Sequence, residues 1–191
     1  IGTEPFARTI LSEAVVFFRR ADGSLVAIED RCCHRALPLS MGAVIGDNIQ
    51  CGYHGLEFDA AGDCVLIPGQ SKIPPGASVK SYPVIEKFNT AWIWMGDPEL
   101  ADEASIPDVW WLDHPDWTPV MECLHMTADY RLLVDNLMDF THVSYLHTKT
   151  ISGDASDGLV GVDTTRDGDR ITVGRWMLDV SPPPMFVAAG G

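Results

Sequence analysis

The chain has 191 residues, 46% of them hydrophobic, with 13 basic and 27 acidic residues and a net charge of -14. This length and composition suit one large domain or two small ones with a buried core. The negative charge disfavours nucleic acids and anionic membrane surfaces as partners, and we find neither a run of about 20 apolar residues nor a signal peptide. We therefore expect a protein of the cytoplasm that does not enter a membrane. Five cysteines, an odd number, favour free thiols or metal ligands over a disulfide framework.

The first half of the chain has the pattern of short antiparallel strands. Between residues 14 and 95, apolar and β-branched runs alternate with turn residues such as Asp22-Gly23. The composition then changes, because proline, aspartate and tryptophan dominate up to Pro119. These features predict a β domain over residues 1–100 and a linker over residues 101–119, packed down by tryptophans.

A second domain is expected over residues 120–191. The best helical pattern in the chain runs from about residue 131 to 147. Strand-like patterns surround this helix, and they cover residues 121–130, 158–165 and 170–180. The whole chain is therefore predicted to be α+β. The absence of an initial methionine and the small residues at the end suggest that both ends are truncated.

Two cysteine and histidine pairs stand out in the first domain. They have the form C-x-H and C-x-x-H, with 16 residues between the pairs, and each follows a strand-like run beside turn residues. A Rieske centre binds one iron through two Cys and the other through two His. A tetrahedral zinc site uses the same ligand types, but its pairs usually have about two to four residues between ligands. The spacing favours a [2Fe-2S] cluster over zinc or chance, with the ligands Cys32, His34, Cys51 and His54.

These two loops resemble the cluster-binding segment of Rieske non-heme iron oxygenases. The resemblance is carried by Cys32-Cys33-His34-Arg35 and Cys51-Gly52-Tyr53-His54-Gly55-Leu56. Cys33 departs from the family, which often has proline there, but this position is not a ligand. Respiratory Rieske proteins add a disulfide and a serine donor, and Leu37, Tyr53 and Leu56 supply neither here. Fewer donors to the sulfurs imply a lower reduction potential.

A second group of chemically active residues follows at the end of the predicted helix. Asp139, His142 and His147 have the spacing D-x-x-H-x-x-x-x-H. Asp139 and His142 share a helix face, whereas His142 and His147 lie about 140° apart around an ideal helix. The two histidines can therefore meet one metal only if the helix breaks or loosens between them. Taken alone, a histidine in such a segment is more often a core residue than a ligand.

Residues 135–147 also resemble the mononuclear iron motif of the same oxygenases. In that family two His and one carboxylate bind Fe(II) and leave positions open for oxygen. The resemblance implies that His142 and His147 bind iron and that Asp139 is an electron bridge. The bridge would run from one iron-binding His to a Rieske His of a neighbouring subunit, most simply His54. The third ligand, a carboxylate, is expected after Gly191.

The resemblance covers residues 8–185 and is nearest to monooxygenases that demethylate aryl ethers, such as vanillate and dicamba demethylases. It implies a terminal oxygenase that takes NADH-derived electrons from a flavin and iron-sulfur reductase or a ferredoxin. It further implies that the substrates are O2 and an aromatic compound and that the protein is a homotrimer. The catalytic domain is expected to be a truncated, helix-grip-like antiparallel sheet flanked by helices. A cis-diol-forming dioxygenase, a Rieske electron carrier without an active site, and a zinc-bound interaction module are the alternatives.

Several further polar residues are expected to be structural. These are His114, His125, Cys64 and Cys123, none of which has a partner at ligand spacing. For Asn136 two roles are possible: its side chain approaches the iron, or it forms hydrogen bonds with backbone groups.

Overall fold

The computed structural model describes residues 1–152 and 160–189. The chain divides into two compact units, residues 1–121 and residues 122–191. Every strand pairing in the described residues is antiparallel, and helices are few, which confirms the expected α+β class. Among these residues no helix is both long and apolar enough to span a bilayer.

The first sheet of the first unit has three strands in the order β1-β2-β3. Its central strand is apolar on both faces, because Val16 and Phe18 pack into one core cluster and Val15 and Phe17 into another. Burial on both faces explains why β2 has four consecutive apolar residues, 15–18. In a strand with one face in solvent, apolar and polar residues would alternate. The bounds are β1 Phe6–Ile10, β2 Glu13–Arg19 and β3 Leu25–Glu29.

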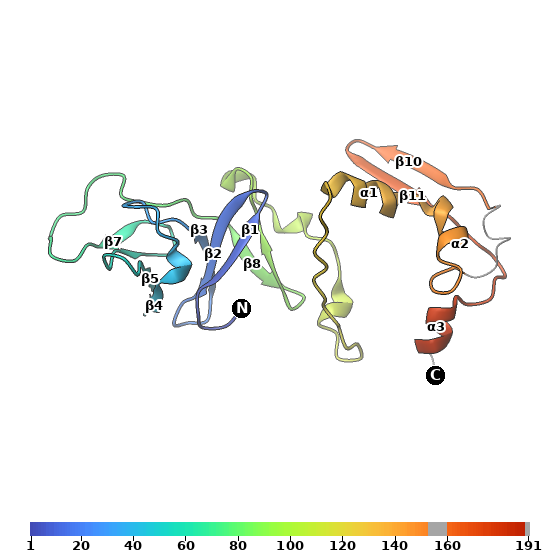
Figure 1. Cartoon of the computed structure of the whole chain (residues 1–191), viewed down its shortest axis with the longest axis horizontal. Helices are drawn as coiled ribbons and strands as arrows, with labels where there is room; N and C mark the ends of the chain where they lie inside the picture. The colour runs from blue at the N-terminus through green and yellow to red at the C-terminus, as the bar shows by residue number, and fades with distance from the viewer. Residues whose placement is uncertain (153–159, 190–191) are drawn as a thin grey trace. The chain divides into compact units, whose positions relative to one another are not determined.

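A second sheet of four short strands carries the two cysteine and histidine loops, and Figure 1 shows it at the opposite side of the unit from the β8 hairpin. One loop precedes the sheet and the other joins its two central strands. The bounds are 3-10 helix η1 Leu39–Met41, β4 Ala43–Ile45, β5 Asn48–Gln50, β6 Glu57–Phe58 and β7 Cys64–Leu66. The hairpin of β8 Val84–Lys87 and β9 Thr90–Ile93 completes the strands of this unit.

Gly42 lies where two backbone segments approach closely beside the second loop. A Cβ atom at this position would lie 1.9 Å from the carbonyl oxygen of Gln50, the residue before Cys51. We expect Gly42→Ala to lower the free energy of unfolding by about 1–3 kcal/mol, because overpacking forces the backbone apart. Thermal unfolding measures this loss. Gly174→Ala is the control, since no heavy atom lies within 4 Å of its Cβ position; equal losses in both variants would contradict the steric account.

Glu13 connects the start of β2 to the segment before β8. Its Oε2 accepts hydrogen bonds from the Tyr82 hydroxyl at 2.5 Å and the Lys80 ammonium at 2.9 Å. The Tyr82 hydrogen bond, and then the Lys80 hydrogen bond, lower the pKa of Glu13. A lowered carboxyl pKa stabilises the fold above the ordinary pKa, and this stabilisation disappears as the pH falls through the folded-state pKa.

We therefore expect Glu13→Gln to lower the free energy of unfolding at about pH 7 and to change it little at about pH 3. Denaturant unfolding at the two pH values checks the difference. Glu4→Gln is the control, because the Glu4 carboxylate has no ion pair or side-chain hydrogen bond in the described part of the chain. A Glu13→Gln deficit of equal size at both pH values would mean that the Glu13 charge is not responsible.

The segment after β9 contains three short 3-10 helices and a group of tryptophans. The helices are η2 Pro98–Leu100, η3 Glu103–Ser105 and η4 Trp110–Leu112. The ring of Trp110 meets those of Trp111 and Trp117 edge-on, with centroids 6.0 and 6.1 Å apart. The boundary between the two units falls after Met121. The assignment of residues 101–119 as a linker stays a prediction.

The second unit differs from the sequence expectation in three places. The expected strand over residues 121–130 is wrong, because these residues have no strand pairing. The single helix expected over residues 131–147 is broken into α1 Tyr130–Met138, η5 Phe140–His142 and α2 Val143–Leu146. The strands are shorter, with β10 at Asp163–Asp167 and β11 at Arg170–Gly174, while residues 158 and 159 lie outside the described residues.

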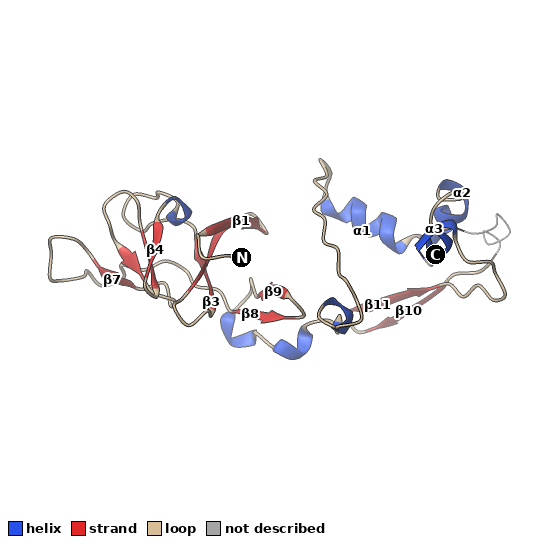
Figure 2. Cartoon of the chain, turned by 90° about the horizontal axis from the view of Figure 1, so that it is seen from below, coloured by secondary structure: helices blue, strands red, loops and turns tan. Residues whose placement is uncertain are grey.

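Figure 2 shows β10 and β11 as one antiparallel hairpin. Helix α3, Pro184–Ala189, follows near the end of the described chain, and the Met185 N–H donates to the Thr150 carbonyl at 3.1 Å. This bond connects the last helix to the turn after His147. Apolar side chains of α1 are exposed, for example Leu132 and Leu137 at 62% each, so this helix has no core of its own in the described residues.

Candidate metal centres

The first loop follows β3 and is closed by two backbone hydrogen bonds. The N–H of Cys32 donates to the carbonyl of Leu37 at 2.8 Å, and the N–H of Ala36 donates to the carbonyl of Cys32 at 2.9 Å. Ala36 adopts a left-handed conformation with φ of 58°, which turns the chain back toward Leu37. These two hydrogen bonds fix the backbone shape of the loop.

The second loop joins β5 to β6 and repeats the same pattern. The N–H of Cys51 donates to the carbonyl of Leu56 at 2.8 Å, and the N–H of Gly55 donates to the carbonyl of Cys51 at 3.0 Å. The left-handed position is again four residues after the cysteine, and here it is Gly55 with φ of 75°. Both loops therefore have the same backbone closure around a cysteine at the base, with a histidine two residues later in the first loop and three residues later in the second.

The four expected ligands come together from these loops. Cys32 and Cys51 are buried, at 3% and 2% exposure, whereas His34 and His54 are exposed. The two imidazole rings lie 4.7 Å apart between centroids, and the Tyr53 ring packs on His54 at 4.0 Å. Burial raises the pKa of the Cys32 thiol, and the neighbouring Cys51 thiol raises it further, while the His34 backbone N–H opposes this shift.

This arrangement fits a Rieske cluster. A buried pair of neighbouring thiols faces the interior, and a pair of imidazoles faces solvent, as required for two Cys on one iron and two His on the other. In residues 1–152 and 160–189, no three His, Cys, Asp or Glu side chains converge on a single point as ligands of one ion.

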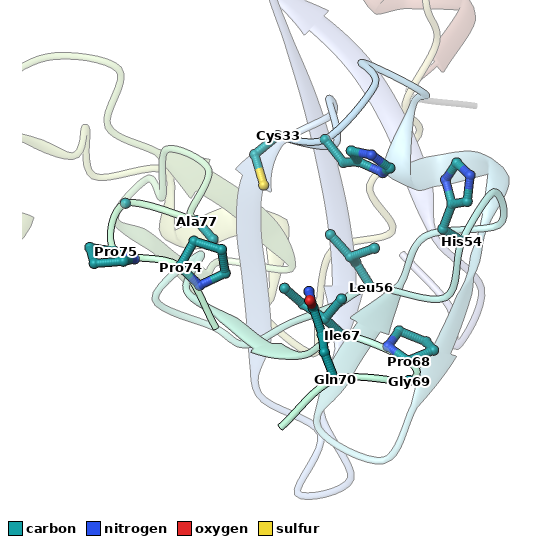
Figure 3. Close-up of a pocket in the computed structure, with 12 residues that line it drawn as sticks. Cys33, His54, Leu56, Ile67, Pro68, Gly69, Gln70, Pro74, Pro75 and Ala77 are labelled. Carbon is teal, nitrogen blue, oxygen red and sulfur yellow. The ribbon is translucent and has the colours of Figure 1, made fainter. Parts of the chain in front are cut away.

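Cys33 lies beside the cluster ligands but points elsewhere. It lines a pocket of about 580 Å³ together with His34 and His54. Figure 3 shows Cys33 and His54 at the edge of this pocket, with Leu56 and Ile67 between them. Cys33 is exposed, in contrast to Cys32, so the side chains of the two adjacent cysteines have different surroundings.

The second group is built on the break in the expected helix. Asp139 ends α1 with an extended backbone, and its carboxylate accepts hydrogen bonds from the Thr141 N–H at 2.9 Å and hydroxyl at 2.5 Å. These side-chain hydrogen bonds replace the backbone bonds that would continue α1. Asp139 therefore ends α1 and is the N-cap of η5. Hydrogen bonds from the Thr141 side chain and backbone lower the pKa of Asp139, and the His142 charge adds a smaller effect.

The two histidines lie close together. His142 ends η5 and His147 caps α2, and their ring centroids lie 5.4 Å apart. An ideal helix would separate them by about 140°. Between them the chain changes from the 3-10 turn η5 to the short helix α2, which ends at His147 with φ of -108° and ψ of 27°. Two imidazoles at this separation can bind one iron with a further carboxylate.

Arg175 is a positioning residue that the sequence did not reveal. It follows β11, and its Nη1 donates to the Phe140 carbonyl at 3.1 Å and to the Ser144 hydroxyl at 3.3 Å. These bonds cross the turn that carries His142, and Ser144 is buried at 1% exposure. The Arg175 Nε atom is buried without a hydrogen-bond partner in the described residues. No local motif marks this arginine, because its partner segment lies about 30 residues earlier in the chain.

The residues expected to be structural lie outside both groups. His114 packs edge-on against Trp110 with centroids 5.1 Å apart, and its Nδ1 accepts from the Asp116 N–H. Cys64 is buried in the main core cluster, whereas Cys123 is exposed. His125 lies in an exposed stretch before α1.

Each half of the chain matches a known protein family. The Rieske [2Fe-2S] domain model matches residues 2–83, and the model of the vanillate O-demethylase oxygenase C-terminal domain matches residues 126–191. The toluene-4-sulfonate monooxygenase system iron-sulfur subunit of Comamonas testosteroni is 46% identical over 177 residues, 91% of this chain and 51% of that protein. The vanillate O-demethylase oxygenase subunit of a Pseudomonas species is 41% identical over 189 residues, 99% of this chain and 53% of that protein.

Solved structures give the same result. The crystal structure of dicamba monooxygenase bound to dicamba superposes with a TM-score of 0.86 at 36% identity, covering 98% of this chain and 56% of that one. The chain thus spans about half the length of the relatives it matches. With a Rieske [2Fe-2S] domain followed by a vanillate O-demethylase-type domain, the chain belongs to the Rieske non-heme iron oxygenases related to vanillate and dicamba O-demethylases.

Proposed function

We propose that the protein is the terminal oxygenase of a multicomponent system that uses O2 and NADH-derived electrons to hydroxylate or O-demethylate an aromatic compound. The relatives named above are a toluene-4-sulfonate monooxygenase component and vanillate and dicamba O-demethylase components. Their names share an aromatic substrate and, in two cases, removal of a methyl group from oxygen. The electrons would come from a flavin and iron-sulfur reductase or a ferredoxin. The protein would work in the cytoplasm, a reducing compartment in which cysteines outside the cluster stay as thiols.

One observation carries the proposal beyond a simple electron carrier. A carrier needs only the first group of ligands, whereas this chain also brings the His142 and His147 rings to 5.4 Å beside the capped Asp139. When bound, the cluster supplies electrons one at a time and the mononuclear iron supplies oxygen activation. A carboxylate from the remaining length of the oxygenase would complete the iron ligands.

The residues of this chain then have distinct roles. Cys32, His34, Cys51 and His54 hold the cluster, and His142 and His147 hold the iron. Asp139 would accept a hydrogen bond from an iron-binding histidine and another from His54 of the partner subunit, which connects the two centres in a homotrimer. Its position at a helix end, with one carboxylate oxygen engaged by Thr141, leaves the other oxygen available. Arg175 holds the segment from Phe140 to Ser144, which carries His142.

Iron content and product analysis test this proposal on the full-length protein. An oxygenase is expected to contain about three irons per chain, and a carrier about two. His147→Ala should lower the content to about two, and His125→Ala, which changes a histidine outside both groups, should not. Incubation with reductase and NADH on methoxylated aromatic acids should release formaldehyde, and toluene-4-sulfonate should give a hydroxylated product. About two irons in the unchanged protein, with no product from any of these compounds, would identify a carrier instead.

A further inference from the structure

Asp30 is the single charged side chain that is buried in the described part of the chain. Its exposure is 8%, and the other buried polar residues, Ser144 and Ser152, are neutral. Burial of a charge is costly, and aspartate is seldom buried in proteins unless a cation pairs with it. Asp30 directly follows β3 and lies two residues before Cys32. The fold thus keeps an anion in its interior at the start of the first cluster loop.

The Asp30 carboxylate is held by neutral donors. The Ser40 backbone N–H donates to its Oδ1 at 2.7 Å, and the Ser40 hydroxyl donates to its Oδ2 at 2.6 Å. Arg31 and Lys80 border the same hollow of about 430 Å³ as Asp30. Neither of them forms an ion pair with Asp30 within the described ranges, and Lys80 is paired with Glu13 instead. Both carboxylate oxygens are therefore hydrogen-bonded, whereas the negative charge is not cancelled by a cation.

The Asp30–Ser40 pair encloses the first cluster loop. These two residues flank the segment 32–37, whose ends are joined by a backbone hydrogen bond. In the second loop the corresponding link is a hydrogen bond from the Gln50 amide to the Glu57 carboxylate at 3.0 Å, and both of these side chains are half-buried. Of the two carboxylates at the bases of the loops, that of Asp30 is thus the one removed from solvent.

A fixed negative charge in the interior acts on the redox equilibrium of a cluster beside it. Reduction adds one electron, which converts one ferric ion to ferrous and makes the cluster more negative. A buried anion opposes this addition, because the low dielectric of a protein interior weakens its field less than water does. The charge, hydrogen bonds and solvent exposure around a Rieske cluster set its reduction potential.

We propose that the buried charge of Asp30 lowers the reduction potential of the Rieske cluster and that Ser40 holds the carboxylate in place. The consequence for catalysis rests on the proposed function, because a lower potential gives a greater driving force for passing the electron on to the mononuclear iron. A cation paired with Asp30 would cancel this effect. The neutral donors of Ser40 satisfy the carboxylate and leave its field intact.

Redox titration of the full-length, cluster-containing protein tests this assignment. An electrode with soluble mediators supplies the electron, and the loss of visible absorption of the oxidised cluster gives the potential. Asp30→Asn removes the charge and keeps an oxygen that accepts from the Ser40 N–H. We expect the equilibrium constant for one-electron reduction to rise about 10-fold, which corresponds to about 59 mV. The rise should persist in about 1 M salt, since salt screens buried charges much less than surface charges. The EPR g values of the reduced cluster should stay unchanged.

Asp63→Asn is the matched control for the loss of one negative charge. Asp63 is exposed and directly precedes the buried Cys64 in the same unit, and solvent screens its field. We expect no change of potential in this variant. Ser40→Ala removes the hydroxyl donor and keeps the Asp30 charge, so its potential should not rise. A rise in Asp63→Asn equal to that in Asp30→Asn would assign the effect to net charge, and an equal rise in Ser40→Ala would assign it to the shape of the loop. Either result would overturn the proposal.

Ser40→Lys is a second test in case the Asp30→Asn protein does not retain its cluster. This change keeps Asp30 and the backbone N–H of residue 40, and it places an ammonium group beside the carboxylate. The potential should then rise as in Asp30→Asn. An unchanged or lower potential in Asp30→Asn, or in Ser40→Lys where Asp30→Asn holds no cluster, would also overturn the proposal. The titration requires neither oxygen nor an aromatic substrate, so a protein without the proposed oxygenase activity can still pass or fail it.

Discussion

Asp139→Asn is expected to reduce product formation by about 10- to 100-fold or more while the visible spectrum of the Rieske cluster stays unchanged. The carboxylate would connect the iron-binding His142 region to His54 of the partner subunit, and an amide lacks the charge needed to hold both imidazole N–H groups. Steady-state turnover and the spectrum of the oxidised protein measure the two effects. Single-turnover reduction of the cluster should also be normal, because electron entry does not involve Asp139.

The choice of asparagine keeps the local fold. The Asp139 carboxylate is the N-cap of η5 through the Thr141 N–H, and asparagine is as good an N-cap as aspartate. Asp163→Asn on β10 removes a charge from the same unit, at an exposed position, and should leave turnover unchanged. Normal turnover in Asp139→Asn would refute the role of Asp139 as a bridge.

Cys32→Ser is expected to abolish the [2Fe-2S] cluster, and Cys33→Ser, one residue later, is expected to retain it. Cys32 is buried against Cys51 at the base of its loop, whereas Cys33 is exposed at the edge of a pocket. A serine hydroxyl replaces a thiolate poorly as a ligand for an iron-sulfur cluster. Visible absorption, acid-labile sulfide and about two of the three irons should therefore be lost in the first variant only.

Comparing substitutions of the adjacent residues Cys32 and Cys33 separates a cluster ligand from a neighbouring thiol. Both substitutions remove one sulfur from the same loop, and circular dichroism should show that both variants are folded. Cys123→Ser, at an exposed position in the second unit, is the control for general thiol loss. Loss of the cluster in Cys33→Ser with retention in Cys32→Ser would require a different ligand register for the first loop.

The sequence predicted the first unit well because the information there is local. Apolar runs and turn residues define short antiparallel strands, and the Asp22-Gly23 turn between β2 and β3 lies at the expected place. The convergence of Cys32 and Cys51 followed from their equivalent positions after two strands. These ligand assignments stay predictions until iron is measured, although the ring separation of His34 and His54 supports them.

The second unit was harder because its structure depends on distant contacts. The helix was expected to continue to residue 147, but the Asp139 side chain begins a new helical segment by capping Thr141. The strand-like pattern over residues 121–130 has no partner strand, and alternation alone does not make a strand without pairing. Arg175 could not be found from sequence, since its hydrogen bonds are to Phe140 and Ser144.

The matching backbone closures of the two cluster loops have a consequence for the speed of electron transfer. Electron transfer is slow when ligands must move between oxidation states, because the activation barrier then contains a large reorganisation energy. Here each cysteine is fixed on both sides by hydrogen bonds within its own loop, at 2.8 to 3.0 Å, and both thiols lie in a packed core. We therefore expect the two cysteine ligands to move little between oxidation states, so that distance and driving force set the rate of electron transfer.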